Sequence, residues 1–205
     1  PGGIRDMEGN IIAPDPATLP PDELNLPTLW RHPALLLAQT CWGPMEFGLQ
    51  KHVRLAGQDS YSGIEGGEEV YYSSAIIMRR GEGVALAAPE DGKPQLSLEA
   101  MRQKRLAFNS LDSMSGYLAL KRDLEASGET PDLLFADQHE TGGHRLSIAA
   151  VVAGHADVAA IDCKSWTFAR RYDEAARALI VAGWTGRRKG LPFISSFELP
   201  AHLFS

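Results

Sequence analysis

The chain has 205 residues, of which 44% are hydrophobic and 22% are charged, and its formal net charge is -6 at pH 7. This composition supplies one sizeable core or two small ones and excludes a disordered chain, because aliphatic residues are plentiful and the charges are mixed. A nucleic-acid partner is not expected, since phosphate neutralisation needs a basic stripe and the basic runs here are short and scattered. A membrane-spanning protein is not expected either, because no apolar run approaches the ~20 residues that a span needs.

The N-terminal region differs in composition from the rest of the chain. Residues 1–33 are rich in Pro, Asp and Gly, which favours loops. They contain no charged-then-apolar stretch typical of a signal peptide, and we expect a processed or truncated N-terminus. Cys41 and Cys163 are too few for a disulfide scaffold and lack zinc-binding spacing; whether they pair stays open.

Short apolar runs and turn residues organise the first half of the chain. Residues 35–38 are typical of a buried parallel strand, and residues 53–57 predict a second strand. A glycine-rich loop at 61–67 leads into a β-favouring run at 70–78. The turn-rich segment 81–94 is therefore the first candidate boundary between two lobes.

The second half alternates between strand and helix patterns joined by short links. Apolar runs predict strands, and apolar residues at helical spacing predict helices. The expected elements are strand 105–109, helix 116–124, strand 133–135, helix 144–152 capped by Gly154, strand 157–161, a helix from 166 to 172 and strand 178–182. This alternation predicts an α/β fold with a parallel sheet and helices on both faces.

Two strand-to-helix corners hold the polar residues best suited to binding an anion. In parallel sheets ligands bind at the carboxyl ends of the strands, where helix N-termini offer unpaired amides and a favourable dipole. The corner at 109–117 combines small hydroxyl residues with a glycine, and the corner at 141–145 places His144 in the first turn of a helix. Ordinary N-capping by Ser and Asp is the alternative explanation for the first corner, and a surface histidine for the second.

Metal and nucleophile chemistry are less well supported. His139 and His144 are five residues apart with glycines between them, whereas zincins need two histidines four apart on one helix, so we expect no metal. Cys163 beside Asp162 could pair with His144 as a nucleophile, but a lone cysteine after a buried strand is more often a core residue. No phosphate-binding loop of the Gly-x-x-x-x-Gly-Lys type or dinucleotide fingerprint is present, so no cofactor is expected.

A series of segments in one order resembles the phosphate/phosphonate (PhnD-like) substrate-binding proteins of ABC transporters. The resemblance runs from about residue 35 to residue 196 and is carried by residues 39–41, 66–77, 109–117, 141–148, 154–166 and 190–193. It implies a two-lobed, type 2 periplasmic-binding-protein fold, parallel-rich with helices on both faces, in which lobe one comprises 1–80 and 186–205 and lobe two comprises 81–185. The strand and helix that open the family's first lobe have no clear counterpart before Leu35.

The resemblance also implies a site and a function. Ser113, Ser115 and Gly116 would cradle an oxyanion at one helix start, and His144 would approach it from the next. Further ligand contacts would come from Tyr72, Ser74, Gln39, Thr40 and Asp162. The implied function is the substrate-binding component of an ABC transporter, with a small anionic solute such as phosphate or phosphonate in the cleft between the lobes, an ABC permease as partner and a periplasmic location.

The sequence departs from the family where ligands with an aminoalkyl tail are recognised. Lys164 and Leu191 stand near the places of the family's acidic residues, so such a ligand is not expected. Two rival functions stay open: a small-molecule enzyme on the same fold that uses Cys163 and His144, and a sensory domain without a transporter. The absence of a visible signal peptide leaves a cytoplasmic location open as well.

Overall fold

The computed structural model describes residues 2–19 and 24–200, and its contacts divide the chain into two compact units. The smaller unit comprises Pro1–Asp59 and Leu191–Ser205, and the larger unit comprises Ser60–Gly190. The sequence-based division at residues 81 and 185 differs from this one. The physical reason is that residues 74–79 form a central strand of the larger unit's sheet, which binds residues 60–80 to that unit.

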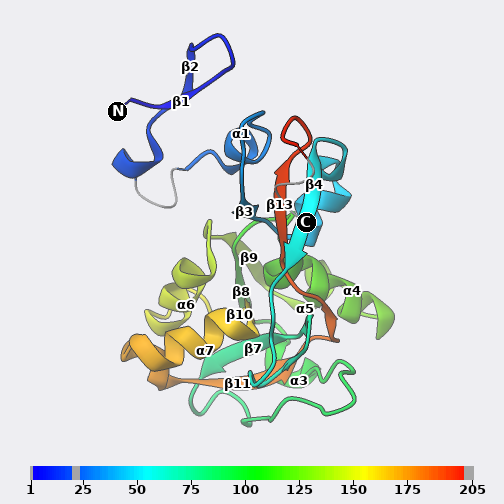
Figure 1. Cartoon of the computed structure of the whole chain (residues 1–205). Coiled ribbons are helices and arrows are strands. Elements are labelled where there is room, and N and C mark those ends of the chain that lie inside the picture. Colours follow the sequence, from blue (N-terminus) through cyan, green and yellow to red (C-terminus); the bar gives the residue numbers. More distant parts are fainter. Residues whose placement is uncertain (1, 20–23, 201–205) are drawn as a thin grey trace. The chain divides into compact units, whose positions relative to one another are not determined.

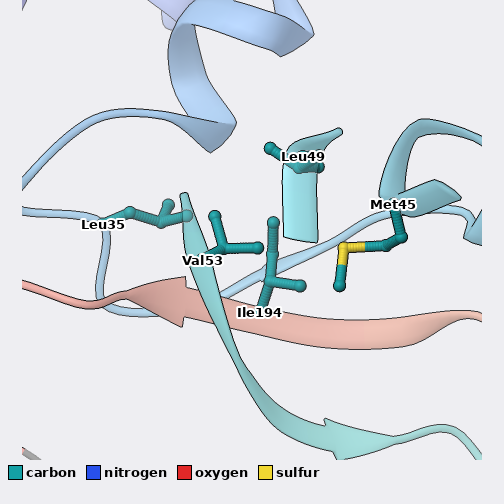
Figure 2. Close-up of a cluster of buried hydrophobic side chains, with 5 residues drawn as sticks. All are labelled: Leu35, Met45, Leu49, Val53 and Ile194. Carbon is teal, nitrogen blue, oxygen red and sulfur yellow. The ribbon is translucent and has the colours of Figure 1, made fainter. Parts of the chain in front are cut away.

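The smaller unit is built on a short antiparallel sheet. Its strands follow the order β3-β13-β4, and β13 is antiparallel to both neighbours. The elements are β1 (Ile4–Arg5), β2 (Ile11–Ala13), η1 (Pro16–Thr18), α1 (Leu26–Trp30), β3 (Ala38–Gln39), α2 (Trp42–Glu46), η3 (Leu49–Lys51), β4 (Val53–Gln58) and β13 (Pro192–Ser196). Figure 2 shows the buried side chains that form its core: Leu35, Met45, Leu49, Val53 and Ile194.

The predicted strand at 53–57 is confirmed as β4, but the buried parallel strand at 35–38 is wrong. Only Leu35 of the apolar run enters the core, while Leu36 and Leu37 are 60% and 57% exposed. The two-residue strand β3 that follows is antiparallel to β13. Neither residue of this short edge strand is buried, so the apolar run did not mark a strand buried on both sides.

The larger unit contains a five-stranded sheet in the order β11-β7-β10-β8-β9. Its strands are β7 (Ser74–Arg79), β8 (Arg105–Phe108), β9 (Asp137–Glu140), β10 (Val158–Asp162) and β11 (Leu179–Trp184). β8 is parallel to β9 and β10, whereas β7 is antiparallel to both β10 and β11. Four strands therefore run in one direction, and their carboxyl ends meet at the edge where β7 begins.

Helices cover both faces of this sheet, as predicted. The chain moves outward from β8 to β9 and then back across β8 to β10, so right-handed crossovers place the two connecting helices on opposite faces. Figure 1 shows α6 and α7 on one side of the sheet and α4 on the other. The remaining elements are β5 (Gly67–Glu68), β6 (Tyr71–Tyr72), α3 (Leu98–Met101), η4 (Met114–Leu118), α4 (Ala119–Ala126), α5 (Pro131–Leu134), α6 (His144–Val152), α7 (Cys163–Tyr172), η5 (Ala175–Ala178) and β12 (Arg188–Lys189).

The helix predicted at 144–152 is confirmed with the same bounds, and Gly154 follows it at φ 76° as a C-terminal cap. The strand predicted at 133–135 is wrong, because Pro131–Leu134 is the short helix α5. Thr130 caps this helix through the amide of Leu133, and Pro131 occupies a first-turn position where its missing N–H costs nothing. None of the helices in the described ranges has the length and hydrophobicity that crossing a membrane requires.

An ion cluster fastens the sheet at the end opposite the candidate corners. The carboxylate of Asp157 accepts hydrogen bonds from the guanidinium groups of Arg105, at 2.8 and 2.9 Å, and of Arg79, at 2.5 Å. Arg79 also donates to the carbonyls of Val151 and Ala156, which tie α6 and the start of β10 to β7. These bonds, from Arg105 first, hold the pKa of Asp157 well below its usual value.

Replacing Asp157 by Asn tests this cluster. We expect the Asp157→Asn change to lower the free energy of unfolding at pH 7 by about 2 kcal/mol, because charge-assisted hydrogen bonds are lost at a partly exposed site. The folded-state pKa is depressed, so the contribution is complete above the unfolded value of about 3.9, declines below it and is lost as the pH falls through the folded-state value. Urea unfolding at pH 7 and pH 3 measures the difference, with exposed Glu99→Gln as control; a pH-independent difference would contradict the assignment.

Candidate functional site

Four polar segments converge at the carboxyl edge of the five-stranded sheet. The corner after β8 leads into η4, the corner after β9 leads into α6, and Asp162 ends β10 at the start of α7. Ser74 opens β7, which starts at this edge because it runs against the other strands. The convergence predicted for the corners around Ser113 and His144 is therefore confirmed.

The η4 corner is held in one conformation by hydrogen bonds from its own residues and from β7. Ser113 is buried, and its hydroxyl accepts a bond from the amide of Gly116 at 3.1 Å. The hydroxyl of Ser74, also buried, donates to the carbonyl of Ser115 at 2.8 Å. Glycine is required at position 116, because a Cβ there would lie 1.4 Å from Oδ1 of Asn109.

A hydrogen bond joins the two corners directly. The hydroxyl of Ser115 lies 2.8 Å from Nε2 of His144, and the amide of Asp162 donates to the same nitrogen over a longer distance of 3.5 Å. Since an amide can only donate, Nε2 acts as the acceptor and the proton of the neutral ring lies on Nδ1. Desolvation by burial lowers the pKa of His144 to about 4, which keeps the ring neutral at pH 7.

The Nδ1–H group of His144 is the unsatisfied donor of the site. It is shielded from solvent and has no hydrogen-bond partner among the described residues. A buried donor without a partner costs free energy, and such groups commonly mark a place for a ligand or an ordered water. Next to a helix start without a side-chain cap, the missing partner is best supplied by an acceptor oxygen.

The first turn of α6 adds further unoccupied donors. Gly143, which precedes the helix, has no side chain that could cap it. The amides of His144, Arg145 and Leu146 accordingly have no acceptor in the part of the chain that the structure describes. Helix α7 differs, because the carboxylate of Asp162 already accepts bonds from the amides of Lys164 and Ser165, at 2.9 Å each. An anion is therefore favoured at the start of α6 and excluded from the start of α7.

Asp162 and Tyr72 are buried in the wall behind these corners. Besides capping α7, Asp162 accepts a bond from the hydroxyl of Tyr61 at 3.3 Å. Desolvation raises its pKa, and the bonds from the amides of Ser165 and Lys164 oppose that shift. Tyr72 is 2% exposed and stacks on the ring of Tyr61, with centroids 5.3 Å apart. Both residues thus have structural roles here, and their contact with a ligand stays a prediction.

Gln39 and Thr40 belong to the smaller unit. The side-chain amide of Gln39 donates to the carboxylate of Asp59 at 3.3 Å. The buried hydroxyl of Thr40 has no partner among the described residues, while its backbone amide donates to the carbonyl of Pro192. Their participation in the site also stays a prediction.

Asn109 is a member of the corner that sequence reasoning did not select as a ligand contact. Its side chain packs over Gly116, and its Oδ1 atom is buried with no partner in the described ranges. The sequence contains a signal for a ligand contact at this position, because an asparagine directly after a strand end and before a helix start lies where ligands bind in such sheets. Side-chain amide oxygen and nitrogen are assigned from surroundings, so this group can serve a ligand as acceptor or, when turned, as donor.

The structure does not form the nucleophile pair considered for Cys163 and His144. Nε2 of His144 contacts Ser115 and the amide of Asp162 instead. Burial, followed by the neighbouring charge of Asp162, raises the pKa of the Cys163 thiol to about 12, so it stays protonated. Cys41 and Cys163 do not form a disulfide, and no group of three or more His, Cys, Asp or Glu residues that could hold a metal is found in the described segments.

The protonation state of His144 can be measured directly. We expect the imidazole of His144 to titrate with a pKa of about 4, below the ordinary value of 6.5, because burial disfavours the charged ring. Nitrogen-detected NMR between pH 3 and pH 8 follows the ring, and the His144→Gln variant identifies its resonances by their loss. A titration near pH 6.5, or a proton on Nε2 at pH 7, would contradict the assignment of Nδ1 as a buried donor.

Solved structures share this fold. The chain is similar to PhnD1 from Prochlorococcus marinus in complex with methylphosphonate, with a TM-score of 0.61 and 16% identity over 80% of this chain and 56% of that one. It is also similar to a binding protein component of an ABC phosphonate transporter from Pseudomonas aeruginosa, with a TM-score of 0.60 and 20% identity over 80% of this chain and 52% of that one. A Xanthomonas citri protein bound to ATP has a TM-score of 0.57 and 18% identity over 86% of this chain and 62% of that one.

These likenesses establish the two-lobed α/β fold of periplasmic binding proteins, and the chain spans between 52% and 62% of the length of these three proteins. No curated protein is similar enough in sequence to count as a match. The sequence model described as "ABC transporter, phosphonate, periplasmic substrate-binding protein" matches residues 51–203, which is most of the chain. The chain belongs to the family of periplasmic substrate-binding proteins of phosphonate ABC transporters.

Proposed function

We propose that the chain is the substrate-binding component of an ABC-type transporter and binds a small oxyanion, such as phosphate or a phosphonate, at the corner formed by η4 and α6. The observation that carries this proposal is the buried Nδ1–H donor of His144, which lacks a partner beside the uncapped start of α6. Family membership supports the same ligand class, as does the methylphosphonate complex of the Prochlorococcus marinus protein.

The proposed partner and location follow from the family. A substrate-binding component delivers its solute to an ABC permease, and the family description places such proteins in the periplasm. We accordingly propose a permease partner and a periplasmic location. An enzyme that uses Cys163 is not favoured, because its thiol is buried and stays protonated.

Neutral donors would stabilise the anion at this corner. The imidazole Nδ1–H lies beside the free amides of α6, where the helix dipole adds a partial positive charge, and the hydroxyl of Ser115 holds the ring in place by donating to Nε2. Two carboxylates of the corners already accept hydrogen bonds: Asp162 caps α7, and Asp112 accepts a bond from the hydroxyl of Ser110 at 2.6 Å.

Substitution of Ser115 tests the proposed function. We expect calorimetry to detect methylphosphonate binding to the unaltered chain, and Ser115→Asp to weaken it at least 100-fold by placing a carboxylate at the anion position. Ser115→Ala should weaken binding roughly tenfold, because the imidazole loses the hydroxyl bond that orients its Nδ1–H donor. The alanine variant keeps the test decisive, because an aspartate at this buried position can also disturb folding, and circular dichroism separates the two effects.

The matched control is Ser127→Asp at the far end of α4, which should leave the affinity unchanged. Unaltered affinity in both Ser115 variants would contradict the assigned corner. Failure of methylphosphonate and inorganic phosphate to bind the unaltered, folded chain would contradict the proposed function itself.

A further inference from the structure

A cavity of about 670 Å³ lies between α6 and α7 in the larger unit. This volume falls within the range of roughly 300–1,000 Å³ that small-molecule pockets occupy, and it is far more than a methylphosphonate would fill. Residues from both helices line it, including His144, Arg145 and Ile148 of α6 and Phe168 and Tyr172 of α7. We refer to it as the α6–α7 groove.

The groove is connected to the anion corner through α6. His144 lines the groove and also forms the 2.8 Å bond to Ser115, so one side chain belongs to both places. The unoccupied amides of α6 start at the same residue. The guanidinium of Arg145, another lining residue, makes no ion pair or hydrogen bond with any described residue, which leaves it available to an anion.

The wall on the α7 side is aromatic and open to solvent. Phe168 and Tyr172 are 49% and 73% exposed, although both rings line the groove. Their centroids are 6.4 Å apart with the rings inclined by 46°, and the guanidinium of Arg171 lies 5.2 Å from the centre of Tyr172. Ile148 supplies a buried apolar floor. Tilted, exposed rings above an aliphatic floor suit a flat apolar group that packs at the ring edges and faces.

Charge fixes the direction of a ligand in the groove. Asp173 and Glu174 line it at the end of α7, roughly 15 Å along the helix from its start. These carboxylates disfavour an anion there, whereas Arg145 and the α6 amides favour one at the His144 end. A ligand with one anionic end and an uncharged, flat remainder matches this distribution.

We propose that the α6–α7 groove receives the organic substituent of the ligand and that this substituent is aromatic, so that the chain binds an arylphosphonate better than methylphosphonate. This inference rests on the proposed function and deepens it by naming the substrate class. The phosphonate occupies the corner at Ser115 and His144, and the ring lies along Phe168 and Tyr172.

Calorimetry with phenylphosphonate and methylphosphonate tests the inference. We expect phenylphosphonate to bind the unaltered chain at least tenfold more tightly. Phe168→Ala, which leaves the anion corner intact, should weaken phenylphosphonate binding at least fivefold and leave methylphosphonate binding unchanged. Leu133→Ala, at an exposed position on α5, is the control and should affect neither ligand.

The same binding measurements distinguish failure of the groove assignment from failure of the proposed function. Equal affinity for both phosphonates, or equal loss for both in Phe168→Ala, would overturn the groove assignment and leave the proposed function standing. Absence of binding for both ligands in the folded, unaltered chain would overturn the proposed function and the groove assignment with it.

Discussion

The carboxyl ends of β8, β9 and β10 meet at one edge of the larger unit's sheet because these strands run in the same direction. Every polar group of the candidate site in that unit depends on this arrangement. Residues from the corners after β8 and β9 are separated by almost thirty positions in the sequence, yet Ser115 and His144 form a direct hydrogen bond. β7 contributes from the same edge because it alone runs the other way, and Ser74 at its start fixes the carbonyl of Ser115.

The backbone amides at the starts of α6 and α7 differ in whether a side chain of the protein accepts hydrogen bonds from them. A carboxylate from the chain itself caps α7, so its amides are satisfied without a ligand. Helix α6 is preceded by Gly143 and has no side-chain cap, and the neutral ring of His144 adds a buried donor beside it. The protein thus carries the cost of unpaired donors where a negative ligand would pair with them, which is the usual condition of a preorganised binding site.

Local signals in the sequence predicted some elements well. Helix α6 was identified with its bounds because helical spacing, preceding glycines and the capping Gly154 all agree. The three apolar residues at 133–135 show no helical spacing and so predict a strand. The helix signal lies before them, in Thr130 as the cap and Pro131 in the first turn. The direction of β7 and the boundary of the larger unit depend on pairing between distant segments, which periodicity does not encode. The two corners were recognisable, but the tautomer of His144 and the packing of Asn109 over Gly116 needed coordinates.

The most direct test of the account is a crystal structure of the chain with methylphosphonate. We expect phosphonate oxygens about 3 Å from Nδ1 of His144 or from the amides at the start of α6. The imidazole should keep its bond to Ser115 through Nε2. A phosphonate bound at another part of the molecule, with the α6 amides and Nδ1 still lacking an anionic partner, would contradict the central claim.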